Sequence, residues 1–189
     1  RDVLRASSLH LSCVVQNSYD SFFHPLLHRI IASVYDCAMS LGVYGLGRFG
    51  YFYAEMLSRL TPVAAYSRNP ERAVPEGVQK AGLDELCACD TIVLCVSISA
   101  MPAVLKGLAP RLRPGQLVMD TCSVKVQPAA WMQEYLPGEV SLMATHPMFG
   151  PDSARGSLQD LPITLWPLRA SDSQLDSWRT SFSALGLRV

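Results

Sequence analysis

The sequence lacks the features that define several large protein classes. Its 189 residues carry 16 Lys and Arg against 16 Asp and Glu, so the net charge is zero, and charged residues make up only 17% of the chain. A neutral chain lacks the basic surface that nucleic-acid binders and polybasic membrane modules need. No apolar run reaches the roughly 20 residues of a membrane-spanning helix. With 49% apolar residues, the chain also lacks the low hydrophobicity of a disordered protein. We therefore expect a globular protein with neither nucleic acid nor membrane as a partner.

The chain also lacks a cysteine pattern typical of metal or redox sites. Of its six cysteines, Cys87 and Cys89 form a C-x-C, not the C-x-x-C of zinc and redox sites. Cys95 and Cys122 lie in or beside apolar runs, as buried free thiols do. Reduced, buried cysteines are typical of cytosolic proteins. We therefore predict a cytoplasmic protein without a bound metal.

Residues 1–38 differ from the rest of the sequence. They hold three of the four histidines, show no hydrophobic period, and fit neither a signal peptide nor a transit peptide. His24 and His28 have the spacing of paired ligands on a helix, but Pro25 between them interrupts that helix. We predict an N-terminal extension of unknown role over 1–38 and one folded domain over 39–189.

From residue 40 onward, short apolar runs alternate with segments of helical period. The runs predict strands at 41–44, 63–66, 78, 91–96, 116–119, 140–144 and 163–166, with a last one starting at 187. The helical segments are 51–60, 83–89, 102–108, 127–135 and 173–185, the last capped by Ser171 or Asp172. Such alternation builds βαβ units, so we predict an α/β fold with a doubly wound, mostly parallel sheet. Ligands of these sheets bind beyond the carboxyl ends of the strands.

The first predicted strand ends in a G-x-G-x-x-G, which here lies between a strand and a helix. In this motif the first glycine permits a tight turn, the second lets a pyrophosphate approach, and the third lets helix and strand pack closely. The N-terminus of the helix offers free N–H groups to phosphates. We predict a Rossmann-type fold whose dinucleotide site contains Gly45, Leu46, Gly47, Arg48, Phe49 and Gly50.

The next two strand ends bear on the choice of cofactor. NAD-binding sheets place an acidic residue about 20 positions beyond the glycines, and here Ser67 and Arg68 stand in its place. A guanidinium binds a 2′-phosphate through two hydrogen bonds, so we predict NADP as the cofactor; the alternative is an ordinary solvated arginine. Val96 and Ser97, at the third strand end, are small and uncharged, which suits a site beneath the ribose and nicotinamide.

Polar side chains also follow the fourth and fifth strand ends. Ser123 comes shortly after the strand at 116–119, where capping of the next helix, contact with a substrate, or both are open. His146 is the sole histidine after residue 38, and we place it where a buried strand ends. A histidine at this edge is a candidate general base, because its pKa lies near neutral pH.

Three of these stretches together resemble one enzyme family. They are residues 45–50, Asp120-x-x-Ser123-Val124-Lys125 and His146-Pro147-Met148-Phe149-Gly150-Pro151. In combination they are similar to the prephenate/arogenate dehydrogenases of tyrosine biosynthesis, over about residues 39–189. The surroundings of Ser67 and Arg68 are most similar to those of the NADP-dependent arogenate dehydrogenases.

The resemblance implies an NADP-dependent oxidative decarboxylation of a cyclohexadienol, either arogenate to tyrosine or prephenate to 4-hydroxyphenylpyruvate. His146 matches the family's catalytic histidine, which bonds the ring hydroxyl and removes its proton. Ser123 matches a serine near that histidine and the nicotinamide. Lys125 matches a motif lysine, to which we assign a role in site structure or in binding substrate charge.

The chain departs from the family pattern at its end. Family members continue into a helical domain that forms the dimer and supplies cationic groups for the substrate carboxylates, whereas this chain stops at Val189. We expect a homodimer only where that domain is present. Carboxylates without cationic partners bind poorly, so we expect these 189 residues to bind NADP but to turn over weakly or not at all.

Two alternative functions remain open from the sequence. One is another NADP-dependent oxidoreductase on the same sheet, such as a relative of pyrroline carboxylate reductase or of hydroxyacid dehydrogenases, which the stretch 146–151 disfavours. The other is a truncated module that binds NADP without catalysis. The intact Ser123, Lys125 and His146 argue against this second alternative.

Overall fold

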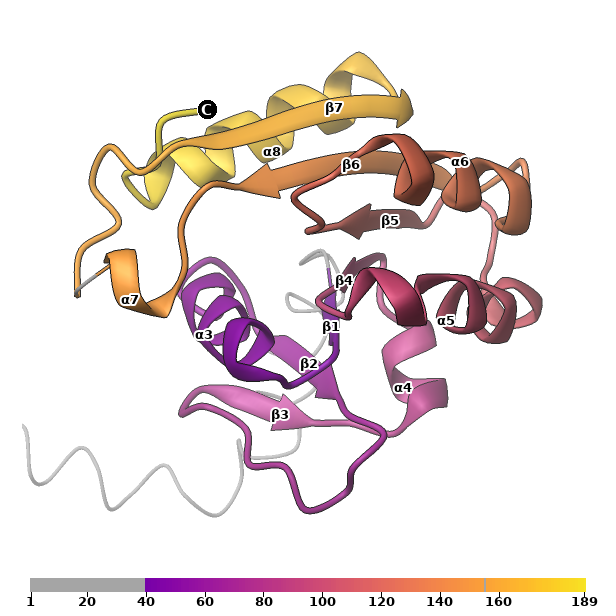
Figure 1. Cartoon of the computed structure of the whole chain (residues 1–189), viewed down its shortest axis with the longest axis horizontal. Helices are drawn as coiled ribbons and strands as arrows, with labels where there is room; N and C mark the ends of the chain where they lie inside the picture. The colour runs from indigo at the N-terminus through magenta and orange to yellow at the C-terminus, as the bar shows by residue number, and fades with distance from the viewer. Residues whose placement is uncertain (1–39, 155) are drawn as a thin grey trace, which may run out of the picture. The chain divides into compact units, whose positions relative to one another are not determined.

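A computed structural model describes residues 40–154 and 156–189, which build a seven-stranded sheet (Figure 1). The strands are β1 (Leu41–Tyr44), β2 (Val63–Tyr66), β3 (Val78–Lys80), β4 (Thr91–Leu94), β5 (Leu117–Asp120), β6 (Ser141–Pro147) and β7 (Ile163–Arg169). The helices are α3 (Arg48–Leu57), α4 (Leu83–Cys87), α5 (Met101–Leu108), α6 (Val126–Tyr135), α7 (Pro151–Ala154) and α8 (Asp172–Ala184). The predicted extension over 1–38, with His24 and His28, lies outside the described residues.

The sheet order is β3-β2-β1-β4-β5-β6-β7, with parallel pairing from β3 through β6. The order reverses at β1, because the chain first runs outward to β2 and β3 and then returns to place β4 on the other side. Such a reversal creates a crevice at the carboxyl ends of β1 and β4. The predicted doubly wound, mostly parallel Rossmann-type sheet is confirmed.

Helices cover both faces of this sheet, and each face has its own hydrophobic core. The side chains of a strand point alternately to the two faces. On β4, Val93 joins the core beneath α3 and α8, whereas Ile92 and Leu94 join the core beneath α5 and α6. All four residues of β1, β4 and β5 are buried, which explains the uninterrupted apolar runs of these strands in the sequence.

The ends of several elements differ from the prediction. Helix α3 begins at Arg48, inside the glycine motif, and β4 ends at Leu94 instead of residue 96. The predicted strand at 163–166 extends to Arg169 and runs antiparallel to β6. The predicted strand after residue 187 is reduced to one isolated bridge, between Pro162 and Arg188. The hydrophobic pattern locates these elements, but tertiary contacts set their ends and directions.

Two capping predictions have different outcomes. Ser171 is the N-cap of α8, and its hydroxyl accepts a hydrogen bond of 3.2 Å from the backbone N–H of Gln174. Ser123 as the cap of the next helix is wrong, because α6 begins at Val126 with Lys125 at the N-cap position and no side-chain capping bond. Ser123 is therefore left exposed in the loop after β5.

In the described part of the chain the four cysteines are free thiols: Cys87, Cys89, Cys95 and Cys122. Cys95 is half-buried and the other three are buried. Over the same residues, no helix is long and apolar enough to cross a membrane.

Candidate functional site

The glycine turn between β1 and α3 is packed tightly on one side and open on the other. Gly45 has a φ of +108°, a region that glycine adopts without strain. A Cβ atom on Gly45 would lie 2.4 Å from the carbonyl oxygen of Cys95, so no larger residue fits. A Cβ atom on Gly47 would meet nothing within 4 Å. The turn is thus pressed against the end of β4, while Gly47 faces free space.

The start of α3 suits an anionic ligand. Gly47 is the N-cap residue, no side chain caps the helix, and its first turn holds no acidic residue. The free backbone N–H groups and the positive end of the helix dipole therefore face the open side of the turn. Together with the space at Gly47, this forms a cradle of the size and charge that a pyrophosphate needs.

A first cavity of about 440 Å³ lies on one side of the glycine turn. It reaches the end of β2, and its lining residues are Tyr44, Gly45, Leu46, Gly47, Ser67, Arg68, Asn69, Arg72, Val96, Ser97 and Ala100. This lining contains two guanidinium groups and no carboxylate. The charged side chains in this lining are therefore both positive.

A second cavity, of about 430 Å³, lies on the other side of the turn. Its lining residues are Gly47, Arg48, Phe49, Gly50, Cys95, Val96, Ser97, Ile98, Thr121, Cys122 and Ser123. The two cavities share Gly47, Val96 and Ser97. An elongated ligand that crosses Gly47 would therefore occupy both of them.

The structure brings most of the predicted site residues to these cavities. Gly45, Leu46, Ser67 and Arg68 line the first, Arg48, Phe49, Gly50 and Ser123 line the second, and Gly47, Val96 and Ser97 line both. Lys125 and His146 line neither cavity.

Sequence reasoning missed Asn69 and Arg72 in the first cavity. The available signal was a second arginine six residues beyond the end of β2, in a stretch too irregular for a periodicity argument. Arg48, which lines the second cavity, also pairs its guanidinium with Asp152 of α7 at the surface. Both side chains of this pair are more than two-thirds exposed, so the pair adds little stability.

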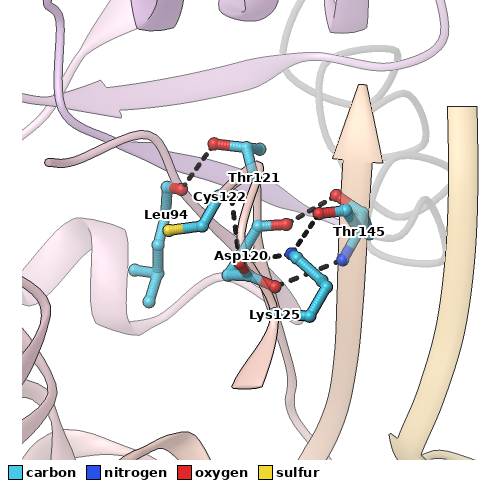
Figure 2. A network of polar contacts seen from close by, with 6 residues as sticks. All are labelled: Leu94, Asp120, Thr121, Cys122, Lys125 and Thr145. Carbon is cyan, nitrogen blue, oxygen red and sulfur yellow. Dashed lines mark hydrogen bonds and ion pairs between the residues drawn. The ribbon is translucent and has the colours of Figure 1, made fainter. Parts of the chain in front are cut away.

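A buried carboxylate organises the loop after β5 (Figure 2). Asp120 is 0% exposed. Its carboxylate accepts hydrogen bonds from the backbone N–H of Cys122 at 2.9 Å, from Lys125 Nζ at 2.7 Å and from the backbone N–H of Thr145 at 3.2 Å. Lys125 Nζ also donates to the carbonyl oxygen of Thr145, and Thr145 Oγ1 donates to the carbonyl oxygen of Asp120 at 2.5 Å. We call Asp120, Cys122, Lys125 and Thr145 the Asp120 network.

His146 follows Thr145 inside β6, not beyond its end as predicted. It lies opposite Thr164 of the antiparallel strand β7 and is half-buried. The antiparallel partner extends β6 to Pro147, which the apolar pattern alone could not indicate. Placing His146 within a paired strand restricts its backbone, which a positioned general base requires.

The thiols beside the second cavity are not nucleophiles at neutral pH. Burial raises the pKa of Cys95 to about 12, and burial together with the Asp120 charge raises the pKa of Cys122 to about 12. Burial also raises the pKa of Tyr53, a fully buried residue of α3, well above its usual value. Over the described residues, no group of three or more His, Cys, Asp or Glu side chains is arranged to hold a metal ion.

Comparison with known proteins gives consistent matches. The family model for "Prephenate dehydrogenase, nucleotide-binding domain" matches residues 61–189. Arogenate dehydrogenase 2, chloroplastic, of Arabidopsis thaliana is 34% identical over 143 residues, which are 72% of this chain and 40% of that protein. Arogenate dehydrogenase 1, chloroplastic, of the same plant is 30% identical over 201 residues, covering 100% of this chain and 30% of that protein. The chain therefore spans less than half the length of either relative.

Among solved structures, the arogenate dehydrogenase of Synechocystis superposes with a TM-score of 0.66 at 26% sequence identity. The match covers 79% of this chain and 58% of that one. The superposed part of that enzyme thus shares its fold with this chain.

Proposed function

Because the chain belongs to the prephenate dehydrogenase family through its nucleotide-binding domain, we propose that it binds NADP and carries the proton-transfer residues of an arogenate or prephenate dehydrogenase. The observation that carries this proposal is the pair of cavities joined at Gly47. One of them is lined by two arginines, and the other by Ser123, on the loop that the Asp120 network ties to β6 beside His146. The remaining alternative is a module that binds NADP without catalysis.

The residues present fit a dinucleotide. The N–H groups at the start of α3 would hold the pyrophosphate, where the Gly47 cradle leaves room for it. Ser67, Arg68 and Arg72 would hold the 2′-phosphate of the adenosine ribose. The absence of a carboxylate from this lining favours NADP over NAD, because an acidic group there would repel the phosphate and bind the free hydroxyls instead.

The proposed reaction needs proton removal beside the second cavity. When bound, the nicotinamide supplies the acceptor for the hydride from the ring carbon that bears the hydroxyl. His146 would take the hydroxyl proton as the carbonyl develops, since a neutral imidazole accepts a proton near neutral pH. The ring carboxylate then leaves as carbon dioxide. The electron pair of the broken C–C bond passes through the ring to the carbonyl oxygen, which takes the proton back from His146 as the ring becomes aromatic. Ser123 would hydrogen-bond the reacting hydroxyl from the opposite loop.

Calorimetric titration of the chain with NADP⁺, and separately with NAD⁺, tests the cofactor assignment. We expect NADP⁺ to bind at least ten times more tightly than NAD⁺. Equal or tighter binding of NAD⁺ would overturn the role given to the arginines. Turnover of arogenate and of prephenate is then assayed with the full-length protein. Tight NADP⁺ binding without oxidation of either substrate would favour the non-catalytic alternative.

A further inference from the structure

The Asp120 network joins the two strand ends that carry the proposed catalytic side chains. Asp120 ends β5 and lies beside Ala144 of β6 in the parallel register. Its carboxylate binds the N–H of Cys122, the residue before Ser123, and the N–H of Thr145, the residue before His146. A single buried carboxylate therefore holds the chain immediately before both Ser123 and His146.

Lys125 completes this arrangement from the other side. Its Nζ atom donates both to Asp120 and to the carbonyl oxygen of Thr145, which belongs to the peptide bond that leads into His146. The Lys125 side chain is only 22% exposed. Its charge is thus paired within the protein and directed at the backbone of β6, as Figure 2 shows.

Stability alone does not explain the presence of this ion pair. Taking two charges out of water costs about as much free energy as their mutual attraction returns, and apolar residues of similar volume often replace such pairs without loss. What apolar residues cannot do is bind the N–H and carbonyl groups of Thr145. The distinguishing property of the pair is therefore that it fixes the backbone on which His146 stands.

We propose that Asp120 and Lys125 are positioning residues that hold His146 and Ser123 at a fixed separation across the ends of β5 and β6. The proposal rests on the proposed function, in which these two side chains act on the substrate. Lys125 then contributes no charge to the substrate, and its loss lowers kcat instead of raising KM. A displacement of about 1 Å at a reacting group lowers the rate about 100-fold.

Three variants of the full-length protein test this role: Asp120→Asn, Lys125→Met, and the double variant that carries both changes. Each single variant leaves one buried group of the pair without its partner, so both Tm and kcat should fall. The double variant leaves no unpaired charge, so its Tm should recover toward that of the wild type. Its kcat should stay about 100-fold low, because no amine holds the Thr145 carbonyl. The NADP⁺ Kd should change less than threefold in all three.

Two outcomes of the kinetics would overturn the proposal. One is a double variant whose kcat recovers together with its Tm, which would reduce the pair to a structural role. The other is a Lys125→Met protein with raised KM and unchanged kcat, which would make Lys125 a ligand of the substrate. Lys106→Met is the matched control, because Lys106 is exposed on α5. Its amine lies over the ring of Tyr135, so its loss should lower stability by no more than about 1 kcal/mol and leave kcat and KM unchanged.

A spectroscopic measurement tests positioning without substrate. The imidazole signals of His146 in an NMR spectrum are assigned by their loss in a His146→Asn protein. In the folded double variant these signals should shift or broaden, and unchanged signals would contradict the proposal. If the wild type oxidises neither arogenate nor prephenate, the proposed function fails, while the His146 signals still decide whether the Asp120 network positions this ring.

Discussion

A Cβ atom on Gly50 would lie 1.8 Å from the carbonyl oxygen of Gly45, so these two glycines join α3 to the turn before it by direct backbone contact. Because the clash would involve a backbone atom, no side-chain rotation relieves it. The contact fixes where α3 starts and hence where its free N–H groups point. The cradle at Gly47 depends on this placement.

Gly50→Ala should therefore lower the free energy of unfolding by about 3 kcal/mol, the upper part of the usual range for overpacking. Urea denaturation followed by circular dichroism measures the change. Gly107→Ala is the control, because a Cβ atom on this exposed glycine of α5 meets nothing within 4 Å. That variant should be more stable by about 1 kcal/mol, the difference in helix propensity. A Gly50→Ala protein as stable as the wild type would show that α3 can shift.

Gly47→Ala should separate cofactor binding from stability. The backbone at Gly47 has an ordinary φ of −69°, and the added methyl group meets no protein atom within 4 Å. Because glycine is preferred over alanine at N-caps, the free energy of unfolding should fall by about 1 kcal/mol or less. The methyl group would occupy the space assigned to the pyrophosphate, so NADP⁺ affinity should fall at least tenfold by calorimetry. Undiminished affinity would place the phosphates elsewhere.

Arg72→Met should weaken NADP⁺ binding about tenfold or more, because a hydrogen bond to a charged group contributes about 1.5–3 kcal/mol. NAD⁺ binding should stay the same, since NAD⁺ has no 2′-phosphate for Arg72 to contact. Arg59→Met, which removes an exposed guanidinium from beyond the C-terminal end of α3, is the matched control. An equal loss of affinity for both cofactors would mean that Arg72 binds a part they share.

Stability should fall at alkaline pH because of the buried thiols. The ordinary pKa of a thiol is 9.0, and burial together with Asp120 raises that of Cys122 to about 12. Between these values the unfolded chain binds fewer protons than the folded chain, so the free energy of unfolding falls as the pH rises. Each such thiol accounts for up to about 1.4 kcal/mol per pH unit.

Denaturant titrations at several pH values from 7 to 10.5 measure this loss, to which Cys95 contributes with the same sign. Below pH 9 these thiols should leave the free energy of unfolding nearly constant. Cys122→Ala should show a smaller loss above pH 9 than the wild type. An identical pH profile in the two proteins would rule out Cys122 as one of the groups responsible.

Local patterns were sufficient for the sheet and for the glycine turn. The apolar runs of β1, β4 and β5 are continuous because these strands are buried on both faces. The positive φ of Gly45 and the contact of Gly50 with Gly45 are both set within five positions along the chain. The Ser171 cap of α8 is equally local. Such features are determined over a few residues, so the order of residues contains the information needed to predict them.

The predictions that failed, and the site residues that were not predicted, have a different cause. The direction of β7 was not predictable, because alternation along a strand is the same for parallel and antiparallel pairing. Ser123 was a plausible cap by composition, but α6 begins only at Val126, after Lys125 has turned back toward Asp120. Arg72 lies in an irregular stretch, where no period indicates which side chains face a cavity.

The sequence by itself determined the alternation of strands and helices, the glycine turn and the resemblance to one family, because each depends on neighbouring residues. Only the tertiary structure decided that Arg72 joins Arg68 in one cavity and that Lys125 binds Asp120 and Thr145. Asp120 and Thr145 are 25 residues apart in the chain, and they meet because β5 and β6 pair in a particular register. The chemistry proposed for His146 thus depends on contacts that folding creates and that no short stretch of sequence contains.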